Sequence, residues 1–177
     1  MEFKELSIPD VLLVKPNVFE DKRGFFMESY QINKFKLGGI DSTFVQDNHV
    51  KSKQKTLRGL HLQINYPQAK LLRCIKGKIF DVAVDVRKDS PYYGKWVGEE
   101  LSEHNKYQLF IPKGFAHGYC VLSEISEIVY KCSDIYHPED ESGFIWNDPE
   151  IGIQWPLDNP ILSERDNNNP LLRDLYK

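Results

Sequence analysis

The chain has 177 residues, of which 41% are apolar and 28% charged, and it is long enough to bury the core of one globular domain. A formal net charge of -3 without long Lys or Arg runs argues against binding to nucleic acid. No segment approaches the roughly 20 apolar residues of a membrane span, and the first residues do not resemble a signal peptide. With three widely spaced cysteines, we expect one cytoplasmic domain, residues 1–177, with reduced thiols and no membrane partner.

Helical periodicity is scarce in this sequence. One short helix is predicted over residues 31–37, QINKFKL, ended by Gly38 and Gly39. The C-terminal residues 163–177 are expected to hold one or two short helical turns. The remaining chain therefore has to build its core from strands.

The strand signal is strongest at residues 79–86, IFDVAVDV, where apolar side chains from Phe80 to Val86 alternate with Asp81 and Asp85. Further strands are predicted at residues 107–112, 118–123 and 126–136. Short strands separated by frequent turn signals predict an all-β fold, a jelly-roll sandwich or barrel.

Residues 57–63, LRGLHLQ, contain an isolated histidine, His61. A metal-binding β-barrel often has a second histidine two places later, where this chain has Gln63. On a regular strand Arg58 and His61 face opposite sides, and a bend at Gly59 would bring them together. A histidine that binds no metal is suited to general base catalysis near neutral pH, and a hydrogen-bonded core histidine is the alternative.

The segment IPKGFAHG predicts a tight turn that delivers His117 to the mouth of a barrel. Together with His61, it resembles the two sequence motifs of the cupin superfamily. Two histidines are too few for zinc or iron, which take three or four protein ligands, unless an Asp or Glu from elsewhere completes the set. We therefore expect no metal and no other cofactor.

A histidine base usually needs a partner that orients its ring, and Asp81, Asp85 and Asp166 are candidates. Asp166, in SERD, would otherwise be a solvated turn residue. Lys70 is a candidate for stabilising an oxyanion, with a surface charge as the alternative. Tyr130 is a candidate acid if its hydroxyl is buried with a partner, and packing is the alternative.

Side chains suited to a nucleotide occur in the first third of the chain. Arg23 and Arg58 are candidates for bidentate contacts to a diphosphate. Gln46 and Asn48 are two residues apart and face the same way on a strand, where amides can hydrogen-bond a pyrimidine edge. Glu28 follows two phenylalanines and is a further candidate for binding.

Over almost its whole length the sequence resembles the dTDP-4-dehydrorhamnose 3,5-epimerase family of the cupin superfamily. The segments that carry the resemblance are FEDKRGFFMESY, FVQDNHVKSKQKTLRGLHLQ, AKLLRCIKGKIFDVAVDVRKDSPYYGKWVGEELS, LFIPKGFAHGYCVLSE, YKCSDIYHPEDESGFIWNDPEIGIQWP and LSERD. The resemblance implies a cupin-type jelly roll, a homodimer and a cofactor-independent isomerase of dTDP-L-rhamnose biosynthesis.

The resemblance also implies a role for each matching residue. His61 matches the catalytic base, Asp166 its dyad partner, Tyr130 the acid and Lys70 the lysine near the C4 oxygen of the sugar. The implied substrate-binding residues are Arg23, Glu28, Gln46, Asn48, Arg58, His117, Glu141 and Arg165.

The implied reaction inverts C3 and C5 of dTDP-4-keto-6-deoxy-D-glucose and gives dTDP-4-keto-L-rhamnose. One alternative is an enzyme of the same family that inverts only C3 or only C5. A 3,4-ketoisomerase on a related scaffold and a metal-dependent cupin oxygenase are further alternatives. A cupin that binds sugar nucleotides without catalysis is the alternative outside the enzymes.

Overall fold

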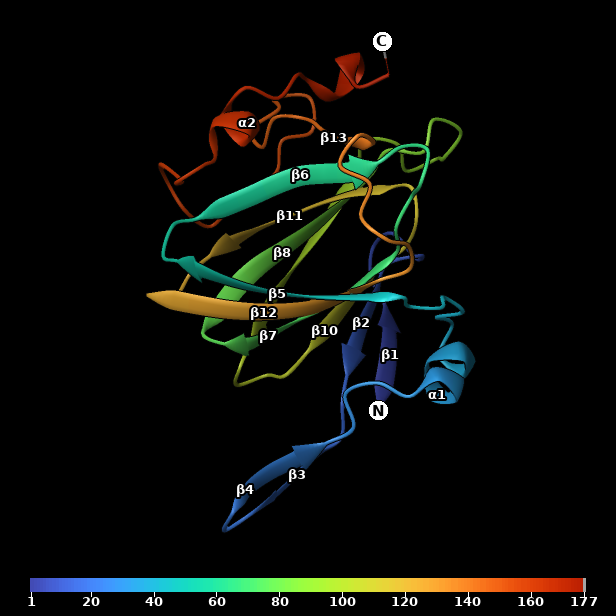
Figure 1. The fold of residues 1–177 in the computed structure, drawn as a ribbon, viewed down its shortest axis with the longest axis vertical. Helices are drawn as coiled ribbons and strands as arrows, with labels where there is room; N and C mark the ends of the chain where they lie inside the picture. The colour runs from blue at the N-terminus through green and yellow to red at the C-terminus, as the bar shows by residue number, and fades with distance from the viewer. Residues whose placement is uncertain (177) are drawn as a thin grey trace.

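The computed structural model describes residues 1–176, and it is an all-β sandwich of two antiparallel sheets (Figure 1). The first sheet has the strand order β1 (Glu2–Glu5), β2 (Leu12–Lys15), β10 (Gln108–Ile111), β7 (Lys70–Lys76), β12 (Ile125–Cys132), β5 (Gln46–Lys53). The second has the order β13 (Glu141–Gly143), β6 (Leu57–Gln63), β11 (Phe115–Val121), β8 (Lys78–Asp85), β9 (Trp96–Ser102). The predicted cupin-type jelly-roll class is confirmed.

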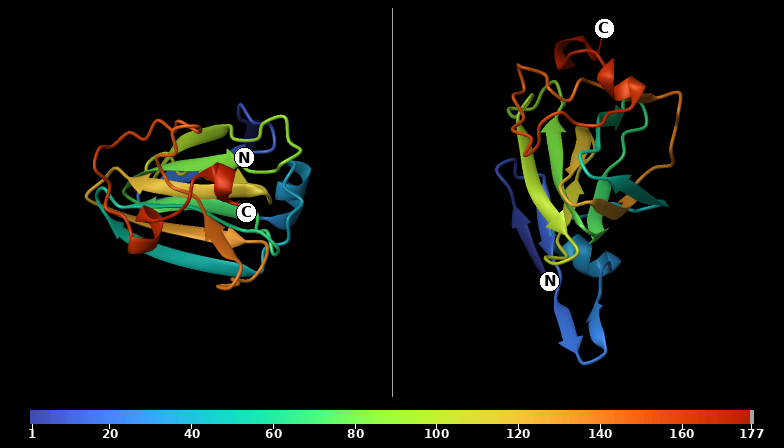
Figure 2. Two further views of the ribbon diagram at one scale, coloured as in Figure 1. Left: turned by 90° about the horizontal axis from the view of Figure 1, so that it is seen from above. Right: turned by 90° about the vertical axis from the view of Figure 1, so that its left-hand side faces the viewer.

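A separate hairpin of β3 (Val18–Asp21) and β4 (Gly24–Met27) extends beyond one end of the sandwich (Figures 1 and 2). The C-terminal residues cover the opposite end and contain α2 (Glu164–Asn167) and a 3₁₀ turn, Leu172–Asp174. The helix predicted at 31–37 is present as α1 (Ile32–Leu37) and stops at Gly38. Within residues 1–176, no helix combines the length and the apolar character that a bilayer crossing requires.

The main core lies between the two sheets. Leu72, Leu109 and Ile128 of the first sheet and Ile79 and Leu101 of the second are at most 1% exposed. These side chains form one contiguous apolar cluster, which holds the sheets face to face.

Strand β8 is buried on both faces, and its predicted alternation is confirmed. Val82 and Val84 pack on the outer side against Phe144 of the C-terminal region. Ile79 belongs to the core between the sheets, so Asp81, two residues later, also faces the interior. A charged side chain in that position needs a partner inside the sandwich.

The bend predicted at Gly59 is present and is a β-bulge. His61 pairs with His117 and Arg58 with Tyr119, so β6 has one more residue than β11 across this stretch. Gly59 has φ +123°, and a Cβ there would lie 2.5 Å from the Cα of Gly118. Only glycine allows both this backbone conformation and this approach of the two strands.

Two strand boundaries differ from the prediction. The strand expected at 126–136 ends at Cys132, and residues 133–140 are irregular. The predicted turn IPKGFAHG ends at Gly114, so His117 lies on β11 itself. Strand ends are set by where hydrogen bonding between neighbouring strands begins and ends. The local pattern of apolar and turn residues does not reveal these points.

Candidate active site

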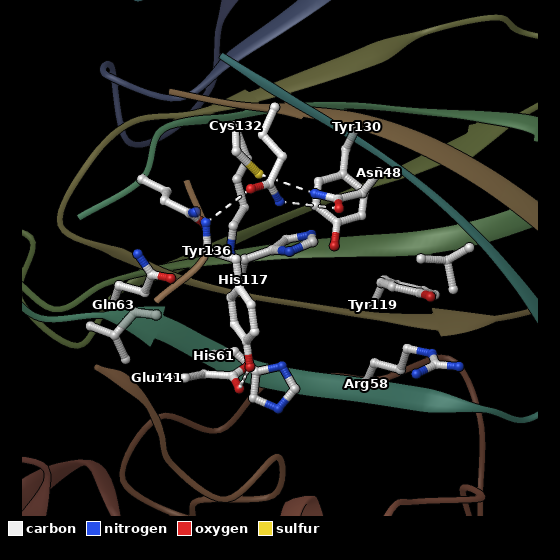
Figure 3. A pocket seen from close by; sticks show the side chains of 15 residues that line it. Asn48, Arg58, His61, Gln63, His117, Tyr119, Tyr130, Cys132, Tyr136 and Glu141 are labelled. Carbon is white, nitrogen blue, oxygen red and sulfur yellow. Dashed lines mark hydrogen bonds between the residues drawn. The ribbon is translucent and has the colours of Figure 1, made fainter. Parts of the chain in front are cut away.

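A cavity of about 370 Å³ lies between the two sheets, and Figure 3 shows the side chains that line it. Its walls come from β5, β7 and β12 of the first sheet and β6, β11 and β13 of the second. Eight residues predicted from the sequence line it: Gln46, Asn48, Arg58, His61, Lys70, His117, Tyr130 and Glu141.

The ring of His61 is held by Asp166, with 2.5 Å between Nε2 and Oδ1. Asp166 is 3% exposed, because Leu57 and Ile161 join the C-terminal segment to the start of β6 by a backbone hydrogen bond. The hydroxyl of Ser163 accepts a hydrogen bond from the Asp166 backbone N–H and caps α2. The expectation of a solvated Asp166 from its local sequence is therefore wrong.

Asp166 is ionised at neutral pH. Burial raises its pKa, but the hydrogen bond and charge of His61, the Ser163 hydroxyl and the backbone N–H of Gly59 outweigh burial and lower it overall. An ionised Asp166 accepts a hydrogen bond from the Nε2–H group, so a neutral His61 has its lone pair on Nδ1. His61 can then act as a base toward the cavity (Figure 3).

Tyr130 faces the same cavity from the other sheet (Figure 3). Burial first, and then the neighbouring Cys132 and Tyr119, raise the pKa of its hydroxyl to about 12. The hydroxyl therefore stays protonated at neutral pH and is available as a weak acid. His61 and Tyr130 thus present a base and an acid from opposite walls.

Lys70 begins β7 and lines the cavity. Burial lowers the pKa of its ammonium group, while the nearby Cys132, Glu141 and Asp81 oppose that shift. An ammonium group in a partly desolvated cavity interacts strongly with negative charge that develops on a ligand.

His117 has its own carboxylate partner. Its Nε2 lies 2.6 Å from Oδ1 of Asp81, which is fully buried. Asp85, the other candidate partner for His61, instead accepts hydrogen bonds from Arg87. The prediction that Asp81 or Asp85 could be the partner of His61 is therefore wrong. The face of β8 that carries them is separated from His61 by β11.

The side chains predicted for nucleotide binding lie along one wall. Arg58 donates from Nε to the hydroxyl of Ser52 at 3.3 Å, and it also interacts with the hydroxyl of Tyr119. Gln46 donates to Asn48 at 3.2 Å, and Asn48 donates to Sγ of Cys132 at 3.5 Å (Figure 3). These contacts fix which atoms of the two amides remain for a ligand.

Glu141 contacts two side chains, Tyr136, which was not predicted as a site residue, and Arg165, which was. The hydroxyl of Tyr136 donates to Glu141 at 2.7 Å, and Arg165 forms an ion pair with the same carboxylate. Burial raises the pKa of Glu141, but these two hydrogen bonds outweigh it and lower the pKa. Tyr136 lies in the irregular segment after β12, where no periodic pattern exposes its role. The other residues that line the cavity were not predicted as site residues: Val50, Leu62, Gln63, Gln68, Tyr119, Cys132 and Tyr136.

Three predicted binding residues are not among those that line this cavity. Arg165 lies beside it, in an ion pair with Glu141. Arg23 is at the tip of the β3–β4 hairpin and pairs with Asp21. Glu28 follows β4 and pairs with Lys34 at 2.8 Å. Among residues 1–176, no group of three His, Cys, Asp or Glu side chains is arranged to hold a metal ion.

His61 on one sheet and Tyr130 on the other face the same cavity, an arrangement suited to an all-β isomerase that transfers protons on both sides of a bound molecule. The family model for dTDP-4-dehydrorhamnose 3,5-epimerase matches residues 5–174. The dTDP-4-dehydrorhamnose 3,5-epimerase of Shigella flexneri is 54% identical over 170 residues, which are 95% of this chain and 94% of that protein. The chain therefore belongs to the dTDP-4-dehydrorhamnose 3,5-epimerase family.

Other relatives agree with this assignment. The Neisseria gonorrhoeae protein of the same name is 54% identical over 94% of this chain, which spans 51% of that protein's length. The crystal structure of the dTDP-6-deoxy-D-glucose-3,5-epimerase of Legionella pneumophila with dTDP-4-keto-L-rhamnose has a TM-score of 0.95 at 44% identity, covering 98% of this chain and 94% of that chain. A dTDP-4-dehydrorhamnose 3-epimerase of Streptomyces niveus is 34% identical over 98% of this chain and 85% of that protein.

Proposed function

We propose that the protein inverts C3 and C5 of dTDP-4-keto-6-deoxy-D-glucose, giving dTDP-4-keto-L-rhamnose for dTDP-L-rhamnose biosynthesis. The observation that carries the proposal is the placement of His61 and Tyr130 on opposite walls of one cavity. Inversion at carbon requires a proton to leave one face and to return to the other, which needs groups on both sides of the ring.

The C4 ketone of this substrate acidifies the hydrogens on C3 and C5. Nδ1 of His61 takes a proton from one of these carbons, and the electron pair of the broken C–H bond forms an enolate with negative charge on the C4 oxygen. The ammonium group of Lys70 stabilises that oxygen electrostatically. Tyr130 then gives its hydroxyl proton to the carbon from the opposite face. The His61 imidazolium releases its proton to solvent and the Tyr130 phenolate regains one, so both groups return to their starting states. The net reaction is an isomerisation and consumes no cofactor.

The nucleotide end of the substrate occupies the wall that carries Arg58, Gln46 and Asn48. The guanidinium of Arg58, which lines the cavity, suits the oxygens of a diphosphate. The N–H groups of Gln46 and Asn48 that are not used within the wall suit the carbonyls of a pyrimidine. His117, Glu141 and Arg165 complete the proposed binding residues.

We also propose that the enzyme is a homodimer in which the β3–β4 hairpin of one subunit reaches the cavity of its partner. Phe19, Phe25 and Phe26 on this hairpin are each more than half exposed, a concentration of apolar surface that favours burial against another chain. The arrangement would bring Arg23 and Glu28, both outside the cavity of their own chain, to the substrate.

The proposed location is the cytoplasm, and the proposed partners include neither nucleic acid nor membrane. Cys74, Cys120 and Cys132 are free and buried, as is usual for proteins of a reducing compartment. The second candidate is a single-centre epimerase, which the 34% identical 3-epimerase of Streptomyces niveus represents.

The deciding experiment is proton NMR of dTDP-4-keto-6-deoxy-D-glucose incubated with the protein in deuterated water. The proposal expects deuterium at both C3 and C5, and L-rhamnose product when a reductase traps the ketone. Deuterium at one carbon only would support the single-centre enzyme. No exchange at either carbon would contradict the enolisation mechanism for this substrate.

A further inference from the structure

Residues 134–137, called the strap below, cross the cavity wall between β12 and β13 without forming helix or strand. The strap carries Tyr136, which lines the cavity. A segment without regular structure leaves its backbone N–H and C=O groups without partners unless other parts of the chain supply them. The position of Tyr136 therefore depends on what binds the strap backbone.

Glutamine side chains supply these partners on both sides of Tyr136. Nε2 of Gln68 donates to the carbonyl oxygens of Asp134 at 2.9 Å and Ile135 at 3.0 Å. Oε1 of Gln46 accepts a hydrogen bond from the Tyr136 N–H at 2.9 Å. Both glutamines line the cavity, so the strap is fastened from inside the site.

Gln63 makes the most complete set of contacts. Its Oε1 accepts from the N–H of His137 at 2.8 Å. Its Nε2 donates to the carbonyl oxygens of Tyr66 at 2.8 Å and Ile135 at 3.4 Å. Gln63 is 6% exposed, and only an amide offers an acceptor and two donors here. The stacked rings of Tyr66 and His137, 4.0 Å apart, join the same two segments.

The strap in turn holds a polar group of the cavity wall. The Tyr136 hydroxyl donates to Glu141 (Figure 3), and the hydrogen bond to this carboxylate is the main cause of the raised Tyr136 pKa. Tyr136 is half exposed, so its own packing does not fix the ring. The orientation of the Tyr136 ring instead depends on its backbone. Gln46 accepts a hydrogen bond from the Tyr136 N–H, and Gln63 accepts one from the N–H of the next residue, His137.

We propose that Gln63 is a positioning residue for substrate binding, which acts by holding the strap so that Tyr136 and Glu141 form the cavity wall. The inference rests on the proposed function, because it assigns Gln63 to the binding of the same sugar nucleotide. It also gives a role to the residue that stands where a metal-binding barrel would place a second histidine.

The test uses Gln63→Met, which keeps the side-chain length and removes all three hydrogen bonds, and Gln63→Glu, which keeps only the acceptor. Gln54→Met is the matched control, since Gln54 is an exposed glutamine whose Nε2 donates to the Leu122 carbonyl, and neither residue lines the cavity. Gln68→Met removes the hydrogen bonds to the carbonyl oxygens of Asp134 and Ile135 in the same strap. This variant takes the place of Gln63→Met if Gln63→Met does not fold.

The readouts are KM and kcat for epimerisation and the exchange rate of the His137 amide hydrogen. Gln63→Met should raise KM about tenfold with kcat within about twofold, and should speed exchange at His137. Gln63→Glu should lie between Gln63→Met and the wild type, and the Gln54 variant should match the wild type.

Two results would overturn the inference in an active enzyme. Unchanged KM and unchanged exchange would show that Gln63 does not hold the strap. A fall in kcat with unchanged KM would show that Gln63 serves the chemical step instead. Wild-type protein that does not turn over the substrate would overturn the proposed function, and the inference with it, and is recognised before any variant is made.

Discussion

Nε2 of His61 lies 2.5 Å from Oδ1 of Asp166, although 105 residues separate them in the chain. His61 comes from the middle of β6, and Asp166 from a one-turn helix that Ser163 caps. The carboxylate orients the imidazole and stabilises the imidazolium that forms when the ring takes up a proton. The proposed catalytic base is therefore built from two segments that are distant in sequence.

Loss of the base should stop exchange at both carbons. His61→Ala should lower kcat by about two to four orders of magnitude, because the proposed general base is lost. Asp166→Asn should have a smaller effect in the same direction, since the imidazole remains but loses its ionised partner. Deuterium incorporation at C3 and C5 measures both. Exchange rates in His61→Ala equal to the wild type would eliminate His61 as the base.

Tyr130→Phe should separate exchange from inversion. His61 still removes a proton in this variant, so deuterium continues to enter from the His61 side. The return of a proton from the opposite face loses its donor, and inversion should slow by about two orders of magnitude. NMR of the product gives the ratio of exchange to inversion at each carbon. An unchanged ratio would mean that Tyr130 is not the acid.

The fall in kcat at high pH, the alkaline limb of the pH profile, should come from deprotonation of Lys70 and not of Tyr130. Burial lowers the Lys70 pKa below 10.5, so its positive charge is lost at a lower pH than for an ordinary lysine. The Tyr130 pKa is raised to about 12, so its proton is retained beyond that point. As pH rises, the Lys70 ammonium group should therefore lose its proton before Tyr130 does, and activity should fall with the loss of that charge.

Lys70→Arg tests this assignment, because a guanidinium keeps its charge throughout the accessible range. The variant should be slower at neutral pH, since the geometry differs, but its alkaline limb should move to higher pH. Tyr130→Phe, measured in parallel, should leave the limb in place. An alkaline limb that does not move in Lys70→Arg would remove Lys70 from the account.

The hairpin proposal predicts complementation between two inactive chains. Arg23→Ala removes a residue that we expect to act in the partner's cavity, and His61→Ala removes the base of the chain's own cavity. Refolding a mixture should form some dimers with one cavity that has both residues intact, and about a quarter of the wild-type activity should return for random pairing. A mixture as inactive as its components would argue against a shared site.

Gly59→Ala should destabilise the fold by at least about 2 kcal/mol, through strain at positive φ and a clash with the backbone of Gly118. Gly24→Ala is the matched control, because Gly24 has φ +126° but a Cβ there meets nothing within 4 Å. Chemical denaturation should show the smaller loss in the control. Equal losses would mean that the close approach of β6 and β11 contributes nothing.

Local pattern was sufficient for part of this molecule. The alternation of β8, the end of α1 at Gly38 and the bend at Gly59 follow from side-chain period and backbone freedom, which neighbouring residues determine. The predicted roles of His61, Lys70 and Tyr130 came from the family resemblance, and the structure brings all three to one cavity.

Only the tertiary structure decided which carboxylate serves which histidine. Local sequence favoured a solvated Asp166, yet the C-terminal segment lies beside β6 and buries it against His61, while the inward face of β8 pairs Asp81 with His117. The strap backbone likewise takes its partners from Gln46, Gln63 and Gln68, on segments distant in the chain. The sequence by itself determined the all-β class, strand β8 and the positions of the end of α1 and of the bend at Gly59, because those depend on adjacent residues. The pairing of polar groups depends on which distant segments meet, and packing of the two sheets and the C-terminal cover decides that.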